Sequence, residues 1–349
     1  MSRLSIFPYV DGRDVAFRAK RFLNRILNRI EFALRRERLW SYPTLAIIDP
    51  TNVCNLKCAL CATGRGTLRM EKGHIDLALY RKIIDTLGPY LYELCLFNWG
   101  EPFLHKDFFA LVRYAKKYAL RTDTSTNFNV ATGETIREIV DSGLDSLTVS
   151  IDGMSQETYS KYRVGGDFDV VMSNLRALVE EKKRRNSATP EIVFRFLVMK
   201  HNVHEMEAAR RLAEELGCRF KKKTIRVDMW NFGEGNIEEQ VALAAEWLPE
   251  ETRFNRYKKR DEKRAKKGRV HVCKDLWQRV FISPQGGIYP CCNIWKDSDL
   301  FSDSFDGDFK TIWNNEKYRM ARRLFRGKKV DLDFICKRCY ESGSHHYVS

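Results

Sequence analysis

The sequence predicts an α/β fold whose main body is a parallel sheet built from six strand–helix units. Two observations support this prediction: short apolar or β-branched runs recur along the chain, and helical patterns fill the segments between them. The six expected strands cover residues 45–48, 94–99, 122–126, 146–151, 192–199 and 224–230. Strands that alternate with helices form right-handed βαβ units around a parallel sheet. Six units are fewer than the eight of a closed barrel.

Helices are expected between the strands, at residues 77–87, 108–118, 135–142, 168–183 and 203–216. Gly143 and Gly217 follow two of these patterns, at positions where glycine commonly ends a helix. We expect an N-terminal basic amphipathic helical segment over residues 1–43 and the barrel over 44–235. A basic linker or bridging helix is expected over 236–269, followed by a small cysteine-rich domain over 270–349.

Residues 13–38 combine nine basic side chains with a helical apolar stripe. The stripe consists of Phe22, Leu23, Ile26, Leu27, Ile30 and Leu34, which recur at spacings of three and four. A basic amphipathic helix can lie on an anionic membrane surface. The alternative, which we favour, is that the stripe packs on the barrel, because most amphipathic helices cover their own core. A second basic segment, 253–269, is interpreted as a solvated face, with a docking surface for phosphate groups as the alternative.

The composition indicates a reducing compartment, and its basic balance indicates a partner with phosphate or carboxylate groups, an anionic membrane, or only solubility. The 349 residues carry a formal net charge of +15 and include ten cysteines. No apolar run approaches the ~20 residues of a membrane-spanning helix, and no secretory signal is visible. Cysteines without such a signal indicate metal ligation rather than disulfides. We therefore expect a cytoplasmic protein, peripheral on the inner face of the membrane if the basic helix binds lipid. Nucleic acid is not favoured as a partner, because no nucleic-acid-binding motif is recognisable.

Three cysteines, Cys54, Cys58 and Cys61, stand directly after the first expected strand. Three thiolates on one tight loop can hold three irons of a 4Fe–4S cube and leave the fourth iron open to a small molecule. A structural zinc site is the alternative, but zinc takes four ligands and C-x3-C-x2-C is not one of its usual spacings. The loop therefore predicts an iron–sulfur cluster with one open position.

This loop resembles the cluster motif of the radical S-adenosylmethionine (SAM) enzymes. Cys54, Cys58 and Cys61 match the three cluster cysteines, and Leu60 matches the aromatic or apolar residue before the last one. The resemblance implies that SAM binds the open iron and that one electron cleaves it to a 5′-deoxyadenosyl radical, which abstracts a hydrogen atom from the substrate. It also implies an open, partial (β/α)6 TIM-like barrel, and a reductase, flavodoxin or ferredoxin as electron donor.

The segment after the second strand resembles a SAM-binding motif of that family. Asn98-Trp99-Gly100-Glu101-Pro102 is similar to the GGEP motif, with Trp99 in place of the first glycine. Glycine at position 100 lets the backbone approach the ligand, and the carboxylate of Glu101 can accept hydrogen bonds from the methionine ammonium group. The departure at Trp99 affects the expected backbone shape more than the expected role of Glu101.

Polar residues also follow the third and fourth strands. Asn127, Ser150 and Asp152 match strand-end residues that the family offers to the ribose and the methionine carboxylate. Each alone would more often be a turn or helix-start residue, but they occur in order after successive strands. Arg163 is interpreted either as an anchor for the SAM carboxylate or a substrate anion, or as a solvated arginine.

The C-terminal part carries a second set of cysteines: Cys273, Cys291, Cys292, Cys336 and Cys339. Four thiolates can saturate a 4Fe–4S cluster or bind a structural zinc. The Gly-Gly-Ile-Tyr stretch at 286–289 predicts a hairpin turn. This region resembles the SPASM/twitch extension of radical SAM enzymes, which implies one auxiliary 4Fe–4S cluster on Cys273, Cys291, Cys336 and Cys339. Cys292 remains, either as a packing residue or as a hydrogen donor to a substrate radical.

These resemblances imply a radical SAM oxidoreductase or epimerase. We expect hydrogen abstraction from a small polar or anionic substrate of the sugar, aminocyclitol or lipid-linked sugar type. Electron loss to the auxiliary cluster would give dehydrogenation, whereas hydrogen return from Cys292 would give epimerisation. Two alternatives stay open: a SPASM maturase that acts on a ribosomal peptide, and a non-catalytic iron–sulfur electron-transfer or scaffold protein.

Overall fold

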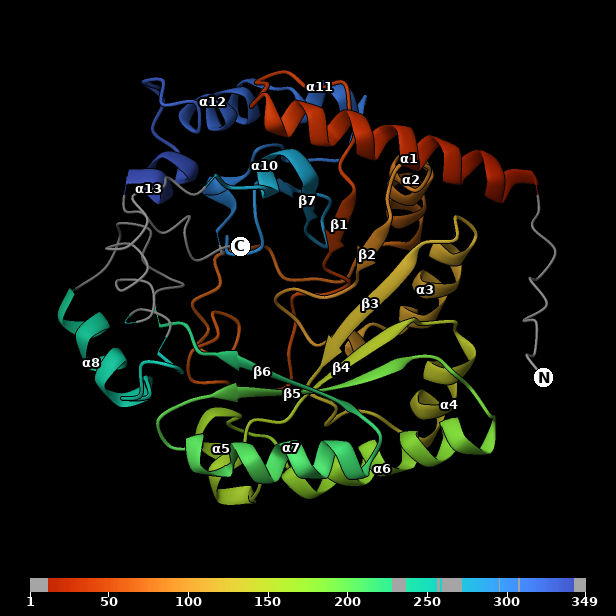
Figure 1. The fold of residues 1–349 in the computed structure, drawn as a ribbon, viewed down its shortest axis with the longest axis vertical. Coiled ribbons are helices and arrows are strands. Elements are labelled where there is room, and N and C mark those ends of the chain that lie inside the picture. The colour runs from red at the N-terminus through yellow and green to blue at the C-terminus, as the bar shows by residue number, and fades with distance from the viewer. Residues whose placement is uncertain are drawn as a thin grey trace, which may run out of the picture.

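A single open sheet of eight strands organises the computed structural model, which describes residues 12–227, 237–255, 258, 272–294, 296–306 and 308–341. The strand order is β6-β5-β4-β3-β2-β1-β7-β8 (Figure 1). The strands are β1 (Leu45–Ile48), β2 (Glu93–Cys95), β3 (Arg121–Thr126), β4 (Ser146–Ser150), β5 (Glu191–Val198), β6 (Arg219–Thr224), β7 (Arg279–Ile282) and β8 (Ile288–Tyr289). Every neighbouring pair from β6 to β7 is parallel. The expected partial (β/α)6 barrel is confirmed.

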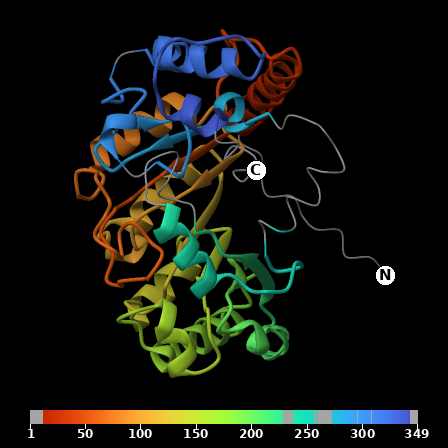
Figure 2. The same ribbon diagram turned by 90° about the vertical axis from the view of Figure 1, so that its left-hand side faces the viewer.

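The helices between the strands lie outside the curve of this sheet (Figures 1 and 2). They are α2 (Leu77–Leu87), α3 (Phe108–Lys116), α4 (Gly133–Asp141), α5 (Gln156–Tyr162), α6 (Phe168–Arg184) and α7 (Met206–Glu215), with short 3₁₀ turns η1 (Pro102–Leu104) and η2 (Val203–Glu205). Helix α8 (Ile237–Trp247) follows the barrel. The C-terminal part adds α10 (Asp275–Gln278), η3 (Asp297–Asp299), α11 (Phe309–Trp313), α12 (Glu316–Leu324) and α13 (Ile335–Glu341).

Capping and burial explain where these elements begin and what they pack against. The carboxylate of Asp76 accepts from the amides of Ala78 and Leu79 and so starts α2, and Asp167 caps α6 in the same way. Apolar residues of the inner strands, such as Leu94 on β2, are fully buried in one continuous core. The helices supply the other half of that core, because each buries one apolar face.

The sixth strand is the one barrel strand whose position the sequence predicted wrongly. It was expected at residues 224–230, but β6 covers Arg219–Thr224. This strand is an edge of the sheet and leaves most of its side chains exposed, so it has no apolar run to reveal it. Residues 228–236 lie outside the described part of the chain, as does most of the second basic segment.

The C-terminal region is attached to the barrel through the sheet itself. Strand β7 pairs with β1, and it forms an antiparallel hairpin with β8, which confirms the predicted turn. Gly286 in that turn has a φ of +87°, a conformation that favours glycine. The buried guanidinium of Arg322 donates to the carbonyl of Leu276 at 2.8 Å and lies over the ring of Trp313. The two cysteine-bearing regions therefore share one rigid framework.

Helix α1 (Gly12–Ala33) packs on the body of the protein through polar residues. Arg21, Asn24, Asn28 and Glu31 are all buried, whereas Phe22, Leu23, Ile26, Ile30 and Leu34 are exposed. The expectation that the apolar stripe packs on the barrel is wrong for these five residues, because hydrogen bonds from the opposite face hold the helix. Within the described residues, no helix has the length and hydropathy needed to cross a membrane.

The hydrogen bonds of Asn28 show how this polar face is satisfied. Its Nδ2 donates to the Trp277 carbonyl at 2.5 Å and to the Ser41 hydroxyl at 3.0 Å. In return, the Trp277 indole N–H donates to the Arg36 carbonyl at 3.0 Å. These bonds join α1 to α10 at the start of the C-terminal region.

We predict that Asn28→Ala lowers the free energy of unfolding by about 1–3 kcal/mol, because buried acceptors lose their donor. The matched control is Leu23→Ala on the outer face of the same helix, which should change it by less than about 0.5 kcal/mol. Urea unfolding of both variants measures the difference. A larger loss for Leu23→Ala than for Asn28→Ala would show that the apolar face is the packed one.

Candidate active site

The first cysteine loop leaves the end of β1 and is supported by the segment after α5. The Lys57 amide donates to the Val164 carbonyl at 2.8 Å, and the Ala59 amide donates to the Tyr162 carbonyl at 3.2 Å. Burial raises the pKa of Cys54 to about 12 and also raises that of Cys58. Thiols in such a place stay protonated unless a metal drives their deprotonation, so cluster loading should release protons.

A cavity of about 770 Å³ opens beside this loop, inside the barrel. Eight of the residues singled out in the sequence line it: Cys54, Cys58, Cys61, Gly100, Glu101, Asn127, Ser150 and Arg163. Seven of them follow or end successive strands, where barrel enzymes collect their reacting groups, and Arg163 follows α5. Asp152, Cys292 and the four other C-terminal cysteines are not among the lining residues. The structure thus brings the three cysteines of the first set and the expected SAM-binding side chains together in a single space.

Glu101 is the buried carboxylate of this cavity. Its two oxygens accept from the Thr126 hydroxyl at 2.6 Å and from the Asn127 amide at 2.7 Å. Burial nevertheless raises the pKa of Glu101 to about 7, although these hydrogen bonds lower it. The Phe103 amide also donates to Oε1 at 3.3 Å. A carboxylate has more lone pairs than these three bonds use, so it can still accept from a cationic ammonium group in the cavity.

Gly100 is required by a close approach of two backbones. A Cβ atom at this position would lie 1.9 Å from the Thr51 carbonyl oxygen, and the Glu101 amide donates to the Val53 carbonyl at 2.9 Å. Any larger residue would push the loop after β2 away from the cysteine loop. The glycine therefore brings Glu101 to the same cavity as the thiols.

Trp99, which replaces the first glycine of the GGEP motif, connects the cavity to the C-terminal region. Its indole N–H donates to the Ile294 carbonyl at 2.8 Å, and its amide donates to the Asp49 carboxylate at 2.9 Å. Burial raises the pKa of Asp49 to about 7, against the backbone hydrogen bonds that lower it. The departure from the motif thus adds an interdomain contact and preserves the position of Glu101.

Asp152 acts on the cavity through Arg163. One oxygen of Asp152 accepts from the Leu197 amide at 2.7 Å, and the other accepts from Arg163 Nε at 2.6 Å. The same guanidinium lies 3.6 Å from the sulfur of Cys58 through Nη1. Arg163 is therefore held in place by a buried ion pair, and the interpretation of a solvated arginine is wrong.

Ser150 and Asn127 also have protein partners. Arg195 Nη2 donates to the Ser150 hydroxyl. The Asn127 side-chain amide donates to Asn55 Oδ1 at 2.9 Å and lies 3.8 Å from the Cys54 sulfur. Both side chains are thus fixed in direction at the cavity wall, which suits residues that receive a ligand.

The C-terminal cysteines form a second group, away from the lining of the cavity. Burial raises the pKa of Cys273, Cys291 and Cys336, and neighbouring thiols raise it further: Cys339 acts on Cys273, Cys336 acts on Cys291, and both Cys273 and Cys339 act on Cys336. A tetrahedral zinc with Zn–S bonds of about 2.3 Å would draw its sulfurs to about 3.8 Å from one another. Among the described residues, the cysteines of neither set form such a compact group within 4.8 Å. Four thiols can hold all four irons of a 4Fe–4S cluster.

Cys292 lies beside this group. Burial raises its pKa to about 11, so its thiol keeps its hydrogen at neutral pH. The following residue, Asn293, lines the cavity and accepts from Arg226 Nη1 at 3.1 Å. The role of hydrogen donor that we expected for Cys292 remains a prediction.

Two further features of the cavity escaped the sequence reasoning. Gly64 packs on the cysteine loop so closely that a Cβ would lie 2.4 Å from the Cys58 amide nitrogen. Six cations line the cavity: Arg163, Arg195, Lys222, Lys223, Arg226 and Arg253. The sequence did not predict the lysines on β6 as cavity residues, because it placed that strand too late in the chain. Gly64 could have been found from its position three residues after the last cysteine of the motif.

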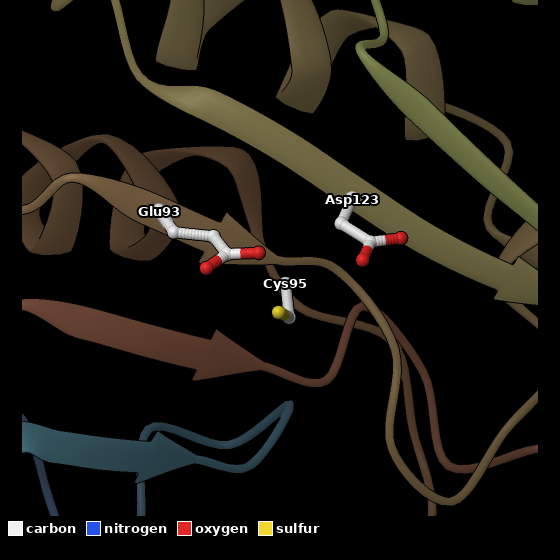
Figure 3. Close-up of side chains that lie close together, drawn as sticks. All are labelled: Glu93, Cys95 and Asp123. Atoms are coloured by element: carbon white, nitrogen blue, oxygen red, sulfur yellow. The ribbon is translucent and has the colours of Figure 1, made fainter. Parts of the chain in front are cut away.

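A compact group of ligand-type atoms, Glu93, Cys95 and Asp123, lies on β2 and β3 (Figure 3). These atoms are within 4.8 Å of one another. Burial, and then the charge of Glu93, raise the pKa of Asp123 to about 6. None of the three residues lines the cavity described above.

In comparisons with known proteins, the barrel and the C-terminal region each match a protein family. Residues 48–213 match the Radical SAM superfamily, and residues 273–340 match the SPASM iron-sulfur cluster-binding domain. The chain is 25% identical over 329 residues to the AdoMet-dependent heme synthase of Methanosarcina barkeri, covering 85% of this chain and 91% of that protein. It is 23% identical over 292 residues to the mycofactocin maturase MftC of Mycobacterium tuberculosis, covering 80% of this chain and 72% of that protein.

The fold is also similar to that of Streptococcus suis SuiB. The structure of SuiB bound to S-adenosylmethionine has a TM-score of 0.60 at 14% identity, covering 86% of this chain and 72% of SuiB. A second structure shows SuiB bound to the precursor peptide SuiA, with the same TM-score and identity, covering 95% of this chain and 76% of SuiB.

The chain is a radical SAM enzyme with a C-terminal SPASM domain. Its cofactors are therefore SAM and 4Fe–4S clusters, including an auxiliary cluster. The two groups of thiols, the close approach at Gly100 and the buried carboxylate of Glu101 all fit these groups.

We predict that Gly64→Ala removes the first cluster, because the added methyl group must displace the backbone of Cys58. Iron analysis of the reconstituted variant should show a loss of one cluster's iron, and the auxiliary cluster should remain. Gly133→Ala is the control, since a Cβ there would lie 3.7 Å from its nearest neighbour, the end of Arg137. Wild-type iron content in Gly64→Ala would contradict the packing described here.

We predict that Glu101→Gln weakens SAM binding by about tenfold to a hundredfold, the cost of losing a hydrogen bond to a charged acceptor. Iron content should stay that of the wild type. Anaerobic titration calorimetry with SAM measures the change. Glu93→Gln serves as the control, because it alters a carboxylate of the same barrel that does not line the cavity. Equal losses in both variants would indicate a general structural effect.

Proposed function

We propose that this radical SAM–SPASM enzyme is a maturase that abstracts a hydrogen atom from a peptide held in the cation-lined cavity. In this proposal Cys54, Cys58 and Cys61 hold the cluster that binds SAM. Cys273, Cys291, Cys336 and Cys339 hold the auxiliary cluster. The single observation that carries the proposal is the cavity itself, where thiols, the SAM-type carboxylate and a set of cations meet.

Together the bound groups supply a 5′-deoxyadenosyl radical for hydrogen abstraction and an auxiliary cluster that can take up an electron. The residues of the chain hold the reactants. Glu101 accepts from the methionine ammonium group, and Gly100 leaves room for it. Arg163, held by Asp152, places its positive charge beside Cys58 and toward the cavity, where it can pair with the methionine carboxylate. Ser150 and Asn127 are available to the ribose.

The remaining cations indicate the chemistry of the substrate. Lys222 and Arg253 both lie over the ring of Phe254, with distances of 5.3 Å and 4.6 Å to its centroid. Their side of the cavity is formed by β6 and the segment after α8, away from Glu101. A row of cations in a partly closed space favours a substrate with carboxylates. A peptide offers these through its C-terminus or its acidic side chains.

The relatives support a peptide more than the sugar-type substrate that the sequence led us to expect. The names of the mycofactocin maturase and of the SuiB–SuiA complex both refer to maturation or to a precursor peptide. A second candidate is heme synthesis, favoured by the alignment with the heme synthase, which covers 91% of that protein. A peptide substrate and a tetrapyrrole substrate would each need a cavity that binds carboxylates.

The decisive experiment uses the reconstituted, reduced protein with SAM and three sets of compounds. These are peptides with a free C-terminus, the same peptides amidated, and iron coproporphyrin. The proposal expects 5′-deoxyadenosine together with a mass change in the free peptides. A changed tetrapyrrole with unchanged peptides would favour the second candidate. Absence of 5′-deoxyadenosine with both clusters loaded would disprove radical chemistry.

Dehydrogenation and epimerisation are then separated by running the reaction in deuterated water. Deuterium in the product of the wild type, and its absence with Cys292→Ala, would assign hydrogen donation to Cys292. Product that has lost hydrogen, in both proteins, would assign the electron to the auxiliary cluster.

We predict that Lys222→Glu raises the KM for an anionic substrate by about tenfold or more, because it replaces attraction by repulsion in the cavity. SAM affinity should not change. Lys221→Glu is the matched control, since Lys221 neighbours it on β6 but does not line the cavity. Steady-state kinetics of both variants measure the difference. The same KM in both variants would place the substrate elsewhere.

A further inference from the structure

The outer face of α1 is an exposed apolar stripe made of Phe22, Leu23, Ile26, Ile30 and Leu34. Phe22 is 59% exposed, Leu23 66% and Leu34 63%. Phe22, Ile26, Ile30 and Leu34 succeed one another at intervals of four residues, so they form one line along the helix. Trp40, 66% exposed, follows the end of this line. Contiguous apolar surface of this kind usually marks an interaction site.

The exposure of the stripe follows from the way α1 is attached, because the opposite face of the helix packs on the protein. Arg21, Asn24, Asn28 and Glu31, on the opposite face, hold α1 against the body. Arg21 donates to the Gly88 carbonyl at 3.0 Å, and Asn24 exchanges hydrogen bonds with the Tyr42 backbone. Glu31 accepts from the Trp40 amide at 2.7 Å and from the Ser41 hydroxyl at 2.6 Å. Turning the helix over would bury the stripe but break all of these bonds.

The surroundings of the stripe are strongly basic. Arg18, Arg25 and Arg29 are exposed, and their spacing of seven and four residues places them along one flank of the stripe. Arg36, also exposed, follows the end of α1. Lys20 is exposed on the other flank. The Arg36 guanidinium lies over the Trp40 ring, 4.7 Å from its centroid.

Acidic side chains do not offset this charge. Residues 17–40 include only two, Glu31 and Glu37. Glu31 is buried, and Glu37 is paired with Arg323, Arg326 and Lys328. Among residues 17–40, the face that α1 turns to solvent therefore carries only positive charge around an apolar centre.

We propose that α1 is a membrane-docking element that holds this enzyme on the surface of an anionic bilayer. Phe22, Leu23, Ile26, Ile30 and Leu34 enter the boundary between headgroups and acyl chains, and the flanking arginines contact the lipid phosphates. Trp40 lies at the headgroup level, where amphipathic aromatic rings are favoured. Charge complementarity selects this occupant, because a second copy of the chain would bring the same cations face to face.

The position of α1 is compatible with docking to a flat surface. It runs along one edge of the molecule beside α11 and α12, as both views show (Figures 1 and 2). The active-site thiols and the lining of the cavity come from other elements. The docking proposal therefore does not depend on the proposed reaction.

The test is cosedimentation of the full-length holoenzyme with vesicles of phosphatidylcholine, with or without phosphatidylglycerol. We expect binding only with phosphatidylglycerol. The double variant Leu23→Ser/Ile30→Ser should bind at least about tenfold more weakly, because it loses apolar insertion. The triple variant Arg18→Gln/Arg25→Gln/Arg29→Gln should lose roughly a hundredfold in affinity for these vesicles, and its binding should become less sensitive to salt. Val170→Ser, an exposed apolar residue on α6, is the control and should bind as the wild type does.

Three results would overturn the proposal. The first is failure of the wild type to bind phosphatidylglycerol vesicles, and the second is unchanged binding by the Leu23→Ser/Ile30→Ser variant. The third is a wild-type dimer, seen by sedimentation velocity, that this variant dissociates while vesicle binding is absent; it would assign the stripe to a second copy. Iron content and thermal unfolding of each variant establish that it is folded.

Discussion

The contact of Gly100 with the backbone of Thr51 is the constraint on which the active site depends. The loop after β2 can approach the cysteine loop only because residue 100 has no Cβ, and the Glu101 amide then bonds to Val53. Parallel pairing of β1, β2 and β3 brings the carboxyl ends of these strands to one edge. A buried carboxylate and three thiols thereby meet in one cavity. Trp99 extends the same loop to Ile294, so the geometry of the cavity and that of the SPASM domain are linked.

The cavity brings a buried carboxylate and several cations into one space. Glu101 is its buried carboxylate near the cysteines, and β6 with the segment after α8 contributes cations. Arg163 is held beside the cysteine loop, because its ion pair with Asp152 directs it to Cys58. The cations on β6 and on the segment after α8 line the same cavity.

Helix α1 reverses the usual relation between polarity and burial. Its amide and carboxylate side chains are buried because each finds a backbone or hydroxyl partner, and a buried polar group that is fully paired costs little. The apolar residues are then left outside. Such an arrangement ties the barrel to the C-terminal region and at the same time presents a surface that a single soluble molecule does not need.

The sequence by itself determined the cluster chemistry and most of the fold. Cysteine spacing and the order of strand-end residues are local properties, and the boundaries of β1 and α2 follow from local apolar patterns and an aspartate cap. Only the tertiary structure decided three other matters: the position of β6, the partner of Asp152, and which face of α1 packs on the protein. An edge strand needs no apolar run, and an ion pair such as Asp152–Arg163 joins distant segments. For α1, hydrogen bonds to Gly88, Tyr42 and Trp277 outweigh the burial of its apolar stripe, and these partners are defined only once the chain has folded.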